Sequence, residues 1–287
     1  MLAMYLKELR SYFTSAIGYV FIGTFLIITG IFFALSNLLS GSAYYNGVLS
    51  NINFIFIFIV PVLTMKLVSE ETKTKTDQLL YTSPLKVTDI ILGKYFAAIT
   101  IFAVSVLITV LYPLILSMFG KVAPLEVLTG YIGLFLLGSS LIAIGLFVSS
   151  LTENQITAVV ITFGAMLFIQ LIDSIQSMLP STRIASIIFV IILIALFVAF
   201  VYFSTKNLVV SAGVGGVGLI ATLVFFLIQK TAFDGLLQKV FEWFSLNKRY
   251  DLFSQGILSM SSIVYYLSFC IAFVFLTVRV IDKRRWS

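Results

Sequence analysis

Few side chains in this sequence could carry out chemistry, and most of the usual catalytic sets cannot be assembled from them. The 287 residues contain no histidine and one cysteine, Cys270, which lies in an apolar run. Histidine-based triads, histidine metal sites, thiolate metal clusters and a disulfide framework are therefore excluded. A phosphate-cradling loop needs the pattern G-x-x-x-x-G-K-S/T. Neither Gly-Lys pair, at 93–94 or at 120–121, lies in such a pattern.

Polar side chains with an interpretable spacing lie in one interruption of an otherwise apolar sequence. The acidic pair Glu70 and Glu71 follows an apolar run, and carboxylates favour the N-terminus of a helix through its dipole. Leu79 and Leu80 would give a short helix here an apolar knob, and Pro84 would end it. Such a segment could dock on another protein, or it could be a solvated loop whose charges only set topology.

The composition requires a membrane around most of the chain. Hydrophobic residues make up 60% of the sequence, charged residues make up 10%, and the mean hydropathy is +1.12. A soluble domain rarely exceeds about half apolar residues, and a water-soluble fold would leave too much apolar surface exposed. The net charge of +6 does not indicate a nucleic-acid partner, because the basic residues flank the apolar stretches.

Eight apolar stretches are long enough to cross the ~30 Å hydrocarbon layer as helices. They cover residues 17–36, 51–68, 91–118, 127–150, 156–173, 184–204, 208–228 and 259–281. The predicted fold is therefore an all-α polytopic membrane protein, with a single transmembrane domain over residues 1–287. A six-span alternative would make 184–228 one re-entrant or interfacial element.

Other segments lie outside the predicted spans. Residues 1–14 place apolar side chains on one helical face and charged ones opposite, which predicts an interfacial helix and not a cleavable signal peptide. Residues 69–90 are the longest polar interruption. Residues 229–258 contain an amphipathic pattern typical of a helix on the outer leaflet.

The distribution of Lys and Arg predicts the orientation of the chain. With both termini on one side, that side holds twelve of the 18 basic residues and the other side holds the remaining six. Since cytoplasmic loops carry the excess of basic residues, both termini are expected in the cytoplasm.

The segment 61–94 resembles the type-2 permeases of ATP-binding-cassette transporters, the ABC-2 family, and in particular their gliding-motility and nitrous-oxide-accessory branch. The opening of the chain, at 7–13 and 18–20, is similar to the elbow helix and first span of that family. The segments 253–258 and 264–268, before and within the last span, are also similar to it. The resemblance covers essentially the whole chain through short motifs.

In that family, the loop after the second span forms a coupling helix that docks on a separate nucleotide-binding subunit. The resemblance implies this role for Glu70, Glu71, Thr76, Leu79, Leu80, Ser83, Pro84, Gly93 and Lys94. Glu153, in the turn 149–155, would make a second contact with that subunit or only solvate the turn. The family usually has Gly where this sequence has Lys75, and Lys favours a continuous helix.

The resemblance implies a transport subunit and not an enzyme. ATP and Mg would be bound by partner ATP-binding-cassette subunits, with no cofactor in this chain. A second permease copy or homologue would complete an exporter in a bacterial or archaeal cytoplasmic membrane. The alternative is an ion-gradient-driven secondary transporter, which is expected to carry ionisable residues at mid-membrane. Asp173, near the outer end of the fifth span, could belong to a proton relay or simply be solvated.

Overall fold

The computed structural model describes residues 1–76, 85–228 and 233–286. Every regular element in these ranges is a helix. Seven helices of this described part are long and apolar enough to cross a membrane, so the chain is an all-α polytopic membrane protein, as its composition predicts. The eighth predicted span forms helix α11 (Leu208–Ile228). Its stretch Leu208–Thr222 is apolar but is shorter than the seven spanning helices.

Two compact units divide the chain. The larger, which we call the core unit, comprises Met1–Gln170 and Leu246–Ser287, and the smaller, the hairpin unit, comprises Leu171–Ser245. The hairpin unit is inserted in sequence between the two parts of the core unit.

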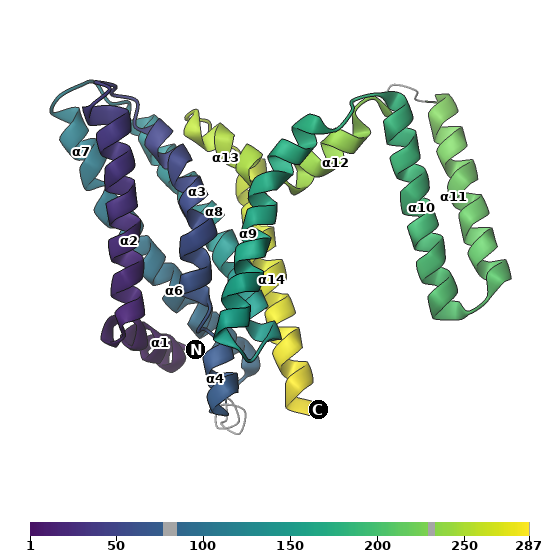
Figure 1. Cartoon of the computed structure of the whole chain (residues 1–287), viewed down its shortest axis with the longest axis horizontal. Coiled ribbons are helices and arrows are strands. Elements are labelled where there is room, and N and C mark those ends of the chain that lie inside the picture. The colour runs from purple at the N-terminus through teal and green to yellow at the C-terminus, as the bar shows by residue number, and fades with distance from the viewer. Residues whose placement is uncertain (77–84, 229–232, 287) are drawn as a thin grey trace. The chain divides into compact units, whose positions relative to one another are not determined.

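Helix α8 (Pro124–Leu151) lies at the centre of the core unit. The other helices of this unit are α1 (Leu2–Thr14), α2 (Ala16–Phe33) with its π-helical extension η1 (Ala34–Leu38), α3 (Asn46–Thr64), α4 (Ser69–Thr74), α6 (Val87–Thr109), α7 (Leu111–Ser117), α13 (Leu246–Ser254), α14 (Met260–Trp286) and most of α9 (Gln155–Met178). Helix α8 packs against α3, α6, α13 and α14, which surround it in Figure 1. Its glycines allow this: a Cβ at Gly138 would lie 2.4 Å from Cε1 of Phe102 on α6.

The described part of the segment 229–258 contains two helices that belong to different units. Helix α12 (Leu236–Phe244), in the hairpin unit, exposes Trp243 and Phe244. Helix α13 is instead packed inside the core unit, where Tyr250 and Phe253 are buried. Hydrogen bonds fix its end, because Nδ2 of Asn46 on α3 donates to the carbonyl of Ser254 at 2.7 Å.

Two apolar helices form the body of the hairpin unit. Helices α10 (Arg183–Thr205) and α11 run antiparallel and pack against each other (Figure 1). They approach closely at Gly215, where a Cβ would lie 3.1 Å from Cγ2 of Val198. The segment 184–228, for which a re-entrant element was the alternative, forms two separate helices of 23 and 21 residues, and α10 is long and apolar enough to cross a membrane.

Candidate coupling site

Helix α1 crosses the first turns of α6 at very short range. A Cβ at Gly93 would lie 3.0 Å from both Cβ of Met4 and the backbone nitrogen of Tyr5, so a larger residue there would displace α1. The hydroxyls of Tyr5 and Thr100, 3.1 Å apart, form a hydrogen bond between the same two helices. Gly93, a predicted site residue, therefore fixes the contact between the interfacial helix and a span.

The chain breaks its helix between α3 and α4, and a side chain of α8 stabilises the break. The hydroxyl of Ser149 accepts hydrogen bonds from the backbone N–H groups of Val68 and Ser69, both at 3.2 Å, and donates to the carbonyl of Met65 at 3.2 Å. Buried backbone groups need such partners once they leave the helix ladder. Ser149 is fully buried, so it holds α4 against the end of α8.

Helix α4 is shorter than the sequence predicts. Glu70 and Glu71 lie in its first turn, as expected, but it ends at Thr74. Lys75 then adopts a left-handed conformation with φ of 57°, which a Cβ disfavours and which glycine adopts freely. The expectation that Lys75 continues the helix is therefore wrong: Lys75 takes the backbone conformation that suits the Gly usual in the family.

A cluster of charges joins α1, α4 and α6; we call Lys7, Glu8, Glu71 and Lys94 the charge cluster. Lys7 is 54% exposed, whereas the other three side chains are largely buried. Nζ of Lys94 lies 3.0 Å from Oε1 of Glu8 and 2.8 Å from Oε2 of Glu71. Nζ of Lys7 lies 2.8 Å from Oε1 of Glu71 and 3.4 Å from Oε1 of Glu8. The Lys94 side chain is only 2% exposed, and the two carboxylates are 12% and 14% exposed.

The carboxylates of the charge cluster favour the charged form of Lys7. Burial lowers the pKa of Lys7, but the hydrogen bond and charge of Glu71, with those of Glu8, outweigh burial and raise this pKa above its ordinary value. The two cations balance the two carboxylates. Removing Lys94 would leave an uncompensated charge in a poorly solvated place, which is costly. The cluster therefore ties the three helices together.

The remaining predicted site residues lie at different distances from the charge cluster. Glu70 pairs instead with Lys66 at 3.6 Å, at the surface. The backbone N–H of Thr76 donates to the carbonyl of Glu71 at 3.0 Å, next to the cluster. Glu153 is exposed in the turn after α8, four residues beyond Ser149. Leu79, Leu80, Ser83 and Pro84 lie outside the described residues.

Sequence reasoning did not find Lys7, Glu8 or Ser149 as site residues. Lys7 and Glu8 carry a signal, because they occupy the polar face of a helix whose other face is apolar. Ser149 carries none, since a serine near the end of a span is ordinary. The predicted candidate Asp173, in the hairpin unit, is half-buried and accepts a hydrogen bond from the hydroxyl of Ser245.

Both ends of the core unit lie near the start of α6. Helix α1 contacts α6 at Gly93, while Arg279 and Asp282, near the end of α14, line a groove with Thr88 of α6. The described residues contain no group of three or more His, Cys, Asp or Glu side chains arranged to hold a metal ion. The ion pairs of the charge cluster link α1, α4 and α6, so a movement of one of these helices can act on the other two.

No curated protein matches the chain. The sequence model of the ABC-2 family transporter proteins matches residues 3–182, which include α1, α4, the first turns of α6 and hence every member of the charge cluster. The chain is a member of the ABC-2 family of transporter proteins.

Proposed function

We propose that this chain is the permease subunit of an ATP-binding-cassette exporter, which moves its substrate across the cytoplasmic membrane of a bacterium or archaeon. A separate subunit would bind ATP and Mg and hydrolyse the ATP. Both units of the chain would form one permease domain, which pairs with a second copy or a homologue. The observation that carries this proposal is the charge cluster, which connects α4 to α1 and α6.

The mechanism follows from where the charge cluster lies. Helix α4 begins the segment 69–90, which we propose docks on the ATP-binding subunit. An ATPase can shift a conformational equilibrium only through contacts that differ between its states. Movement of a docked α4 would carry Glu71 with it, and Glu71 pairs with Lys94 of α6 and Lys7 of α1. These helices would resist separation from α4, because separation would leave charges unpaired in a poorly solvated place. Span α6 and the interfacial helix would then move with α4.

The proposed orientation places α1, α4 and the end of α14 in the cytoplasm. It is supported by the excess of Lys and Arg in the segments on that side. Similarity at 7–13, 18–20 and 61–94 further supports the gliding-motility and nitrous-oxide-accessory branch. Membership of the ABC-2 family favours a permease over an ion-gradient-driven secondary transporter.

The experiment that tests this function is purification of the chain in mild detergent. We expect it to co-purify with a subunit whose sequence contains a phosphate-cradling loop, recognised by mass spectrometry. We also expect the isolated chain to hydrolyse no ATP, because neither of its Gly-Lys pairs lies in such a loop. ATP hydrolysis by the pure chain, or a sodium or proton gradient alone sustaining transport, would contradict the proposal.

A further inference from the structure

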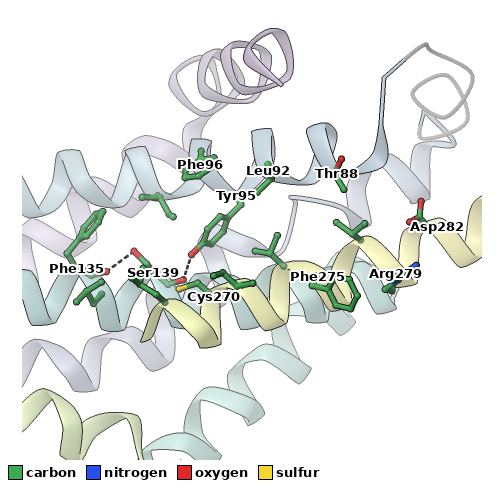
Figure 2. Close-up of a pocket in the computed structure, with 16 residues that line it drawn as sticks. Thr88, Leu92, Tyr95, Phe96, Phe135, Ser139, Cys270, Phe275, Arg279 and Asp282 are labelled. Carbon is green, nitrogen blue, oxygen red and sulfur yellow. Dashed lines mark hydrogen bonds between the residues drawn. The ribbon is translucent and has the colours of Figure 1, made fainter. Parts of the chain in front are cut away.

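The core unit contains a groove that does not belong to the charge cluster. It has a volume of about 720 Å³ and is lined by α6, α8 and α14, within the range of about 300–1,000 Å³ typical of small-molecule sites. Phe96, Leu267, Ile271 and Phe275 along it are exposed, so the groove opens at the surface of the unit. Figure 2 shows its lining side chains.

The polar groups in the middle of the groove are bonded to one another. The hydroxyl of Tyr95 donates to the carbonyl of Ser139 at 3.1 Å, as Figure 2 shows. The Cys270 thiol is buried, 3.5 Å from the hydroxyl of Ser140. These groups therefore need no hydrogen bond from a ligand. The other side chains that line the middle of the groove are aliphatic or aromatic. An apolar occupant therefore fits this part of the groove.

One end of the groove is different, because Thr88, Arg279 and Asp282 gather there (Figure 2). The guanidinium of Arg279 lies 4.9 Å from the ring centroid of Phe275. Within the described residues, neither Arg279 nor Asp282 has an ion-pair partner. Their spacing of three residues on a helix places both side chains on one face. This end therefore offers a cation and a carboxylate side by side.

The length of the groove matches one leaflet of a bilayer. From Thr88 to Ile99 the groove follows α6 for eleven residues, which is about 16 Å at the rise of an α-helix. Half of the hydrocarbon layer is about 15 Å thick. The charged end lies near the start of α6 and the end of α14, where these spans reach the membrane surface. One acyl chain with its headgroup spans the same depth.

We propose that this groove binds one phospholipid with a phosphoethanolamine headgroup. The acyl chain lies along α6 and α14. Arg279 and the Thr88 hydroxyl donate to the phosphate, as guanidinium groups do in charge-assisted pairs. The Asp282 carboxylate accepts from the primary ammonium. A purely anionic headgroup would satisfy Arg279 but leave Asp282 facing a like charge. A protein partner would need a surface much broader than this groove.

Native mass spectrometry of the full-length chain, purified with any subunit it carries, tests this proposal. The protein is mixed with equal amounts of phosphatidylethanolamine and phosphatidylglycerol, and each bound lipid is counted. We expect one retained phosphatidylethanolamine per chain. Ile99→Trp fills the groove and should lower retention by excluding the acyl chain. Arg279→Gln removes the phosphate partner and should lower retention about tenfold, as loss of a hydrogen bond to a charged group does. Asp282→Asn should remove the preference for phosphatidylethanolamine.

The controls keep the proposal falsifiable. Leu107→Trp adds the same ring to an exposed position of α6 outside the groove, and Arg10→Gln removes an exposed charge from α1; both should retain lipid like the wild type. Arg279 is exposed, so its variant reports on binding even if Ile99→Trp fails to fold. Retention by Arg279→Gln equal to the wild type would mean that surrounding lipid coats the surface only, and would overturn the proposal. Equal binding of the two lipids by the wild type would overturn the headgroup assignment.

Discussion

A comparison of helices α8 and α10 shows that the more apolar helix of this protein is not the more buried one. Helix α10, in the hairpin unit, is the most apolar of the seven spanning helices, yet only 6% of its most apolar stretch is buried inside the chain. Helix α8, in the core unit, is less apolar, and 78% of its corresponding stretch is buried. In a soluble protein the more apolar helix would be the more buried one.

Lipid as the solvent explains this reversal. Lipid tails are as apolar as leucine, so helices gain nothing from hiding apolar surface from them, and association depends on close packing and hydrogen bonds. Helix α8 supplies both, with small residues such as Gly138 and with hydroxyls such as Ser149. Helix α10 presents mainly Ile, Leu and Phe side chains outward. Small and polar residues in a span therefore mark the packed part of this chain.

The largest effect is expected where the core unit buries charge. Lys94→Met would leave Glu8 and Glu71 with only the half-exposed Lys7 as a cation, and breaking a buried ion pair costs about 3–5 kcal/mol. Lys66→Met breaks the exposed pair with Glu70, where a loss of no more than about 1 kcal/mol is expected. Unfolding free energies of both variants in the same detergent check this difference. Equal losses would show that the cluster does not hold α4.

A smaller effect should separate the glycines of the two units. Gly138→Ala places a Cβ 2.4 Å from Phe102, and overpacking a tight core costs about 1–3 kcal/mol. A Cβ at Gly216 of α11 meets nothing within 4 Å, so Gly216→Ala should stabilise its helix by about 0.5–1 kcal/mol. Thermal unfolding of the two variants gives the signs. Destabilisation by Gly216→Ala would mean that the exposed face of α11 is packed against a partner.

The smallest effect concerns the strained end of α4. Lys75→Gly removes a Cβ from a left-handed position and should stabilise the folded chain by about 1 kcal/mol. A matched change on the regular part of the same helix, Lys73→Gly, should destabilise it by a similar amount, because glycine is unfavourable inside helices. Both shifts can be read from thermal unfolding. Destabilisation by Lys75→Gly would refute the left-handed assignment.

The sequence predicts the helices of this protein better than it predicts their contacts. The helix predicted at 1–14 forms as α1, and the stretch 208–228 forms α11, because both patterns are local. Helix α13 lies in a segment whose pattern is amphipathic, and its burial depends on Asn46, some 208 residues away in sequence. A contact between residues so far apart cannot be predicted from the local pattern of a single sequence.

The candidate site shows the same division between local and distant information. Gly93 and Lys94 are predicted from motif spacing, but their partners on α1 are not. Gly93 contacts Met4, and Lys94 pairs with Glu8, which lies 86 residues earlier in the sequence. The left-handed Lys75 is missed because helix propensity favours lysine, while the fold requires the helix to end there. Local hydrogen bonds close the helix there, because the N–H groups of Lys75 and Thr76 donate to the carbonyls of Thr72 and Glu71.

The most direct test of the coupling account is the amount of ATP-binding subunit that co-purifies with variants of segment 69–90. Leu79→Asp and Leu80→Asp, outside the described residues, would place a charge in the proposed docking contact. Loss of a central interface side chain commonly costs about 2 kcal/mol or more. Lys239→Ser, at an exposed position of α12, is the control. The account predicts that both Asp variants insert normally but lose the ATP-binding subunit, or retain it without substrate-stimulated hydrolysis, while the control keeps both. Wild-type assembly and hydrolysis in both Asp variants would contradict the account and make this segment a topological spacer.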